Sequence, residues 1–306
     1  MLVDEVPSPK AAPVALDRFL IGSRILDCPR LPSLGSVNVA LRELLVADQS
    51  YNSQIADVIR RDPSLTARLL RLASSVYFGL TTPVNNIEEA VFYLGLGQIR
   101  QLAMITPVIE DFQKLAGQTQ FPWREFWQHC IGTAIMTREV ISAVKAPIDD
   151  ADYVAGLVHD VGKIVMAATF SDHFTEIHRL AKQGTRHLRE IELQVLGMDH
   201  TELGALYLRH HSMPELLIEA ARFHHTPERS KKKQQVVAAV QVANLLVNHA
   251  RIGESGDYIK VADDAWLESS GWRILFPNRD EVAKNAAIAS LKNSLDRLPS
   301  LLDGLV

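Results

Sequence analysis

The sequence predicts an all-α protein, and three features of the chain support that fold class. Apolar residues recur at helical spacing in successive stretches, and one such stripe is formed by Leu65, Leu69, Leu72 and Val76. Asp62-Pro63, directly before that stripe, is typical of a helix start, with Asp as the N-cap and Pro at the first helical position. No convincing strand-like alternation of apolar and polar residues occurs in the first half of the chain.

The composition is that of an ordinary globular protein. The chain has 306 residues, of which 47% are hydrophobic and 22% charged, enough for one large domain or two smaller ones. The net charge of −4 does not indicate a general nucleic-acid binder. A short basic run at 229–233 lies between two helical patterns, where we expect a solvated loop. We therefore expect no nucleic-acid partner.

Three features of the chain indicate a cytoplasmic protein without a membrane partner. The two cysteines, Cys28 and Cys130, make no disulfide framework and suit a reducing compartment. The first ten residues lack the basic start and apolar run of a signal peptide. No stretch reaches the 18 or so apolar residues of a membrane span, since the closest, at 236–247, is interrupted by polar side chains.

The pattern divides the chain into four parts. We expect a flexible arm over residues 1–14, a helical subdomain over 15–120, a second helical subdomain over 121–250 and a C-terminal extension over 251–306. The extension contains an amphipathic helix whose apolar face is formed by Ile288, Leu291, Leu295, Leu298 and Leu302. Two placements are open for this helix: against the body of the protein, or exposed as a dimer or partner surface.

The doublet His159-Asp160 is the centre of the candidate site. It follows the apolar residues of one predicted helix and precedes Gly162-Lys163, where the glycine is expected to permit a tight turn. Imidazole nitrogen and carboxylate oxygen are both metal ligands, and the doublet places them together at a helix end.

Five of the 11 histidines fall on or beside the inward faces of successive predicted helices: His129, His159, His200, His224 and His225. Burying that many polar rings without partners would be costly. A shared metal or a shared polar cluster is the economical explanation, and the ligand types suit iron, manganese, zinc or nickel. The others are expected at the surface or at helix ends: His173, His178, His187, His210, His211 and His249.

A distinctive order of motifs occupies the first half of the chain: Leu31-Pro32, then the stretches at 59–65, 69–79, 87–91 and 94–95. In this order the first half resembles the N-terminal part of the HDOD family, the HD-related output domains of bacterial signalling proteins. Ser74-Ser75 stands where the family usually has Asn-Ser. The resemblance implies an HD-like helical bundle after an N-terminal HDOD subdomain, and a signalling protein as partner.

The second half resembles the HD superfamily of helical metal-dependent phosphohydrolases, including the HD-GYP branch. His129 matches the first histidine of the family pattern, and His159-Asp160 match the doublet. In two-metal relatives later helices add histidines, to which His200, His224 and His225 correspond, and the doublet Asp bridges the ions. Lys163 matches a lysine that contacts substrate phosphate. The resemblance thus implies one or two divalent ions and a phosphate or nucleotide ligand.

The sequence departs from the superfamily pattern at Asn244, which stands where the final Asp ligand is expected. An amide oxygen can coordinate but brings no negative charge, so metal affinity should fall. Two functions stay open: a metal-binding signalling module with weak or no catalysis that acts through protein interactions, and an active phosphodiesterase-like phosphohydrolase using the six histidine and aspartate ligands. Only the second would make Lys163 and Asp160 catalytic.

Overall fold

The computed structural model describes residues 12–28, 89, 90, 92, 119–147, 150–277 and 280–302. Every element in this part of the chain is a helix, and no strand occurs in it, which confirms the all-α prediction. The helical patterns predicted between residues 31 and 112 lie almost wholly outside the described residues, so the boundary at 120 stays a prediction.

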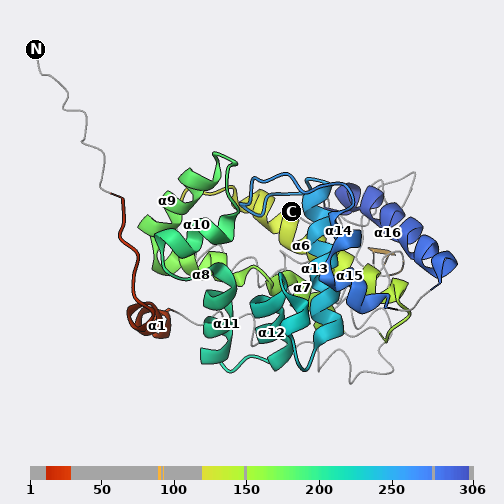
Figure 1. Cartoon of the computed structure of the whole chain (residues 1–306), viewed down its shortest axis with the longest axis horizontal. Coiled ribbons are helices and arrows are strands. Elements are labelled where there is room, and N and C mark those ends of the chain that lie inside the picture. The colour runs from red at the N-terminus through yellow and green to blue at the C-terminus, as the bar shows by residue number, and fades with distance from the viewer. Residues whose placement is uncertain are drawn as a thin grey trace, which may run out of the picture.

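The described elements, in chain order, are α1 (Arg18–Leu26), α6 (Trp123–Ala143), α7 (Asp150–Val158), α8 (Val161–Thr169), α9 (Ser171–Ala181), α10 (Leu188–Val195), α11 (His200–His210), α12 (Glu215–Phe223), the 3₁₀ turn η2 (Pro227–Arg229), α13 (Gln234–His249), α14 (Ala265–Glu268), α15 (Ser270–Leu275) and α16 (Glu281–Leu302) (Figure 1). None of these described helices combines the length and apolar character needed to cross a bilayer.

Helices α6 and α13 form the centre of the bundle. They pack against each other, and α7 packs against both. Helix α6 is buried over most of its circumference, and its buried side chains include Phe126, Trp127, Ile131 and Met136. Helix α13 is almost entirely apolar from Val237 to Val247. A helix that is apolar on nearly all sides must lie inside the fold, which explains why other helices pack around these two.

Helices α8 to α12 cover one side of this centre. Helix α11 packs on α8 and α12, and α9 packs on α8 and α10. Asp199 caps α11, as its Oδ1 accepts a hydrogen bond from the Glu202 amide at 3.0 Å. The Glu202 carboxylate does not complete a capping box; it pairs with Arg18 at 2.7 Å and Arg222 at 2.6 Å. These two ion pairs tie α11 to α1 and α12.

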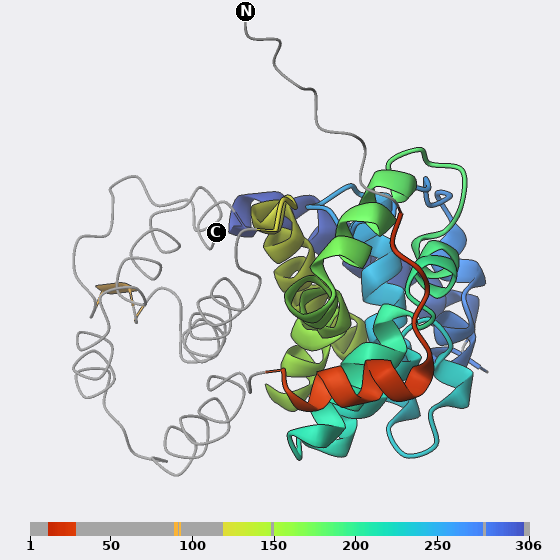
Figure 2. The same cartoon turned by 90° about the vertical axis from the view of Figure 1, so that its left-hand side faces the viewer.

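Helix α1 lies across α8 and α11 (Figure 2). Asp17 caps it by accepting from the Leu20 amide at 2.8 Å. The extended stretch before it is fixed at two points, where the Leu16 amide donates to the Leu196 carbonyl at 2.9 Å and His173 Nε2 donates to the Val14 carbonyl at 3.0 Å.

The C-terminal extension folds back on the bundle. Trp266, Trp272 and Phe276 are buried; Trp266 meets Trp272 edge to face, and Trp272 stacks on Phe276. Helix α16 packs on α6, where Leu298 lies over Gly132. Of the two placements left open by its sequence, docking on the body is therefore the one observed.

Candidate metal centre

The His159-Asp160 doublet lies in the break between α7 and α8. Helix α7 ends at Val158, α8 begins at Val161, and Asp160 is the N-cap residue of α8. Its side chain makes no capping hydrogen bond. Both residues are buried, with exposed fractions of 0% and 1%. The helix break therefore aims two metal-ligating side chains into the interior.

Two glycines allow the neighbouring helices to come close enough to meet the doublet. A Cβ atom on Gly156 of α7 would lie 2.7 Å from the Ala134 backbone of α6, and one on Gly162 of α8 would lie 1.8 Å from the His200 carbonyl of α11. No side chain fits at either crossing. Gly162 is thus needed for helix packing, and it does not form the tight turn that the sequence predicts at this position.

The Asp160 carboxylate faces histidines on both of its oxygens. Oδ2 lies 3.3 Å from His159 Nε2 and 3.8 Å from His129 Nε2. Oδ1 lies 3.3 Å from His200 Nε2 and 3.6 Å from His224 Nε2. We name His129, His159 and Asp160 Oδ2 the doublet group. The other side of the carboxylate belongs to a second group.

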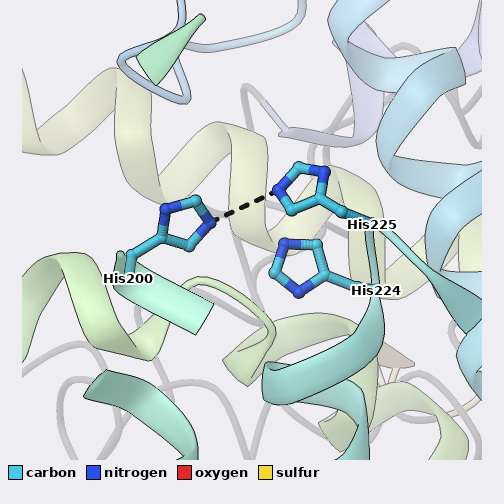
Figure 3. Close-up of side chains that lie close together, drawn as sticks. All are labelled: His200, His224 and His225. Atoms are coloured by element: carbon cyan, nitrogen blue, oxygen red, sulfur yellow. Dashed lines mark hydrogen bonds between the residues drawn. The ribbon is translucent and has the colours of Figure 1, made fainter. Parts of the chain in front are cut away.

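The second group is completed by His225, and we name His200, His224, His225 and Asp160 Oδ1 the triple-histidine group. His225 Nε2 lies 3.4 Å from His200 Nε2, and Figure 3 shows these two rings pointing at each other with His224 beside them. His200 opens α11, whereas His224 and His225 directly follow α12. The ligand nitrogens of the three histidines all lie within 4.8 Å of one another.

Hydrogen bonds at Nδ1 set the tautomers of three of these rings. His159 Nδ1 donates to the Gly156 carbonyl at 2.8 Å, and His224 Nδ1 donates to the Ala220 and Ala221 carbonyls at 3.1 Å each. His200 Nδ1 donates to the buried Glu192 carboxylate at 2.7 Å. With Nδ1 as the donor, the neutral form of each ring presents an unprotonated Nε2 toward Asp160, the arrangement seen for histidines that bind metals.

Burial keeps His129, His224 and His225 neutral, whereas Asp160 stays charged. Burial, reinforced by the charge of His159, lowers the pKa of His129 to about 3. The pKa values of His224 and His225 fall well below their ordinary value for the same reason, with neighbouring histidines adding to it. Burial alone would raise the pKa of Asp160, but His159 and Lys163 outweigh it and hold that pKa well below its usual range.

These side chains fit a divalent transition metal. Within the part of the chain that the structure describes, four of the buried ligand atoms have no hydrogen-bond partner: His129 Nε2, His159 Nε2, His224 Nε2 and Asp160 Oδ1. An ion with four ligands at about 2.0–2.1 Å has ligand atoms about 3.3–3.4 Å apart. The separations of 3.3 to 3.8 Å around Asp160 are close to that spacing. Histidine and carboxylate donors suit zinc, iron, manganese or nickel.

A cavity of about 760 Å³ reaches the triple-histidine group from outside. His224 and His225 lie in its wall together with Asn244. The same wall carries two cationic side chains, Arg189 and Lys260, and two acidic ones, Glu190 and Asp257. His129, His159, Asp160 and Lys163 are not part of this wall. The triple-histidine group therefore contributes two histidines to the cavity wall, whereas the doublet group contributes only its candidate amide ligand, Asn244.

The family model for the HDOD domain matches residues 31–227, which is more than half of the chain. The chain belongs to the HDOD family. The match begins at the Leu31-Pro32 stretch and ends just beyond His225, so it includes every candidate ligand except Asn244. It confirms the resemblance inferred from the sequence motifs.

Relatives of this HDOD protein share its fold at low sequence identity. An uncharacterized protein of Treponema pallidum (strain Nichols) is 26% identical over 236 residues, which are 74% of this chain but 43% of that protein. The chain thus spans less than half the length of that relative. The structure of an HDOD domain protein of unknown function from Geobacter sulfurreducens superposes with a TM-score of 0.70 at 24% identity, covering 97% of this chain and 94% of the other. A candidate phosphohydrolase from Shewanella amazonensis SB2B gives 0.65 at 20% identity, covering 94% and 98%.

Lys163 and Asn244 depart from the roles implied by the HD superfamily. Lys163 is buried at 3% exposure, and its Nζ donates to Asp160 Oδ2 at 2.6 Å and to the Ser255 carbonyl at 2.8 Å. Asn244 lies beside His129, where its side chain partly offsets the fall in that histidine's pKa. The Asn244 Oδ1 atom accepts a hydrogen bond from Asn248 at 2.7 Å. Lys163 therefore neutralises the aspartate, and the Asn244 oxygen is already engaged.

The sequence alone did not identify Glu192 or Ser255 as part of the site. Glu192 has a recognisable signal, because it stands four residues after the buried Leu188 on the apolar face of α10. Ser255 acts through its backbone carbonyl, for which no side-chain pattern exists. His173 and His178 lie in the first and last turns of α9, as the helix-end expectation allows, but both are buried, with exposed fractions of 9% and 6%. His178 lies instead among Phe121 and Phe174.

Proposed function

We propose that this HDOD protein is a metal-binding module of a bacterial signalling pathway, with weak or no catalytic turnover, that acts through a protein partner in the cytoplasm. The observation that carries the metal-binding part is the convergence of unpartnered ligand atoms on both oxygens of Asp160. A buried cluster of polar atoms without hydrogen bonds is costly unless a ligand satisfies them. The signalling part is supported by membership of the HDOD family and by the resemblance of its motifs to output domains.

The residues of the site would have different roles in binding one or two ions. Asp160 faces both groups and supplies the negative charge. Glu192 fixes the ring of His200 from behind, since a single carboxylate oxygen accepts from both the His200 amide at 2.9 Å and the ring at 2.7 Å. A bound divalent ion would supply positive charge and acidify a coordinated water.

Two features favour weak or absent turnover. Lys163 is turned away from the cavity and held on Asp160, so in this arrangement it does not face a phosphate bound there. Asn244 replaces a carboxylate with a neutral amide, which lowers the negative charge available to neutralise an ion. Both features concern the doublet group, at which the HD superfamily pattern is centred.

A second function, metal-dependent phosphohydrolysis, is favoured by the cavity. Its wall brings His224 and His225 together with two cationic side chains, Arg189 and Lys260, that could contact a phosphate or nucleotide ligand, beside the acidic Glu190 and Asp257. The fold shared with the Shewanella amazonensis protein supports the same reading. In this alternative the cationic side chains bind and orient the phosphate, and Asp160 keeps its position between the two groups.

One set of measurements separates the two functions. Protein purified without added chelator should contain a transition metal by elemental analysis, and His159→Ala combined with Asp160→Ala should remove it. Cyclic dinucleotides and simple phosphomonoesters should not be hydrolysed with added Mn²⁺ or Fe²⁺. Robust hydrolysis that disappears in the double variant would establish the phosphohydrolase instead. Equal metal content in both proteins would contradict the proposed site.

A further inference from the structure

The two groups of ligands around Asp160 are unequal, and their differences all point the same way. We propose that the triple-histidine group is the primary metal site of this protein, which fills first and binds more tightly than the doublet group. The inference rests on the proposed metal-binding function and specifies the order in which the groups are occupied. It reverses the order that the HD motif suggests, because that motif is centred on the doublet.

The first difference is the number of imidazole ligands. The triple-histidine group offers three imidazole nitrogens within 4.8 Å of one another, and Asp160 Oδ1 lies 3.3 Å from that of His200 and 3.6 Å from that of His224. The doublet group offers two imidazoles and Asp160 Oδ2. Its fourth candidate, the Asn244 oxygen, already accepts a hydrogen bond from Asn248. That oxygen has a second lone pair for an ion, but a neutral amide binds a divalent ion less strongly than the carboxylate expected at this position.

The second difference is a competing cation. The Lys163 ammonium lies 2.6 Å from Asp160 Oδ2, the oxygen of the doublet group. The same ammonium is held by the Ser255 carbonyl at 2.8 Å. The loop that carries Ser255 is itself anchored on α6, since the Glu254 amide donates to the Glu125 carbonyl at 2.9 Å. A buried positive charge fixed at this oxygen repels a divalent ion and occupies one of its ligands.

The third difference is the support behind the ligands. Glu192, 1% exposed, places a carboxylate on the far side of His200, which makes that ring a stronger donor. In the doublet group, His159 is supported by the neutral Gly156 carbonyl. The triple-histidine group therefore has a nearby negative charge where the doublet group has a nearby positive one.

The fourth difference is access. His224 and His225 lie in the wall of the cavity, and His225 is only half-buried. His129 and His159 are fully buried and do not reach the cavity. An ion can therefore enter the triple-histidine group directly.

The test is a titration of full-length, metal-stripped protein with Zn²⁺ against a competing chelator. His225→Ala and His129→Ala form a matched pair that removes one histidine from each group. We expect His225→Ala to weaken the first equivalent of Zn²⁺ by more than about 100-fold and His129→Ala to leave it within about threefold. The second, weaker equivalent should disappear in His129→Ala. Circular dichroism checks that both variants stay folded.

Two further variants test the causes. Glu192→Gln should weaken the first equivalent by about 10–100-fold, whereas Glu190→Gln, an exposed glutamate on the same helix, should not. Lys163→Met should strengthen the second equivalent about tenfold or more and leave the first unchanged. With Co²⁺ as the probe, the intense visible bands of a four-coordinate site should appear with the first equivalent and persist in His129→Ala.

Each result has one meaning. Loss of the first equivalent in His129→Ala and its survival in His225→Ala would overturn the proposed order while leaving metal binding intact. Equal loss in both variants would overturn it as well, because the two groups would then act as a single site. Absence of any Zn²⁺ binding by the unmodified protein would remove the proposed function itself.

Discussion

The buried pair formed by Asp160 and Lys163 should be coupled strongly in the metal-free protein. At 2.6 Å and an effective dielectric constant of about 20, the attraction between the two charges is about 6 kcal/mol before the cost of removing both from water. Asp160→Asn keeps the shape of the side chain but leaves Lys163 as an uncompensated cation that is 3% exposed. Breaking such a buried pair typically costs about 3–5 kcal/mol.

The Ser255 carbonyl remains as a partner for Lys163, so we expect a loss near the lower end, about 3 kcal/mol. Because 1 kcal/mol shifts the melting temperature by about 2–4 °C in a domain of roughly 150–250 residues, Asp160→Asn should melt about 6–12 °C lower. Adding Lys163→Met should restore most of that loss, since the stranded charge is then gone.

Urea unfolding of chelator-treated protein at neutral pH, followed by circular dichroism, measures the cycle. Glu176→Gln is the matched control, because Glu176 and Arg179 make a pair at the same i, i+3 spacing on the surface and the change should matter little. A loss below about 1 kcal/mol for Asp160→Asn, or a double variant no more stable than the single one, would refute the coupling argument.

Three further predictions concern other parts of the molecule. Burial, with repulsion from Lys163, lowers the pKa of His178 to about 3. Below about pH 6.5 the unfolded chain therefore binds a proton at this histidine that the folded protein does not bind, so the free energy of unfolding should fall as the pH falls. Urea titrations between about pH 6 and 4 should show that His178→Phe reduces the pH dependence of the free energy of unfolding by about 1.4 kcal/mol per pH unit. An unchanged slope would mean that His178 titrates normally. Gly162→Ala should force α8 and α11 apart, which lowers the free energy of unfolding by about 1–3 kcal/mol or more and weakens Zn²⁺ binding in the same sample. A variant with native Zn²⁺ affinity would show that metal binding does not need the close crossing of these two helices. Saturating Zn²⁺ should raise the melting temperature of the stripped protein, and His200→Ala should reduce that rise measured by calorimetry; a full rise in the variant would place the ion elsewhere.

Much of the fold and the ligand set could be predicted because each depends on local pattern. Helix α13, from Gln234 to His249, contains the apolar stretch that the sequence shows at 236–247. The inward positions of His129, His200 and His224 follow from helical spacing, and all three are buried. The structure also brings His159, Asp160 and His225 to the same place, as the metal hypothesis required.

What could not be predicted depends on how the helices cross. The spacing of the histidines does not say which carboxylate oxygen each one faces, and that division follows from the crossings at Gly156 and Gly162. The sequence pattern does not predict the ion pair between Lys163 and Asp160, because the position of the Lys163 ammonium also depends on a hydrogen bond to a backbone carbonyl 92 residues away. The burial of His178 likewise depends on a contact with the C-terminal extension at Gly256.

The central claim is that Asp160 lies between two groups of metal ligands. Crystals of the protein grown with Zn²⁺, with diffraction data collected above and below the zinc absorption edge, test it most directly. The account predicts an anomalous peak between His200, His224 and His225 on the Oδ1 side of Asp160, with a weaker or absent second peak beside His129 and His159. A well-ordered His159-Asp160 pair without any peak within bonding distance of Asp160 would contradict it.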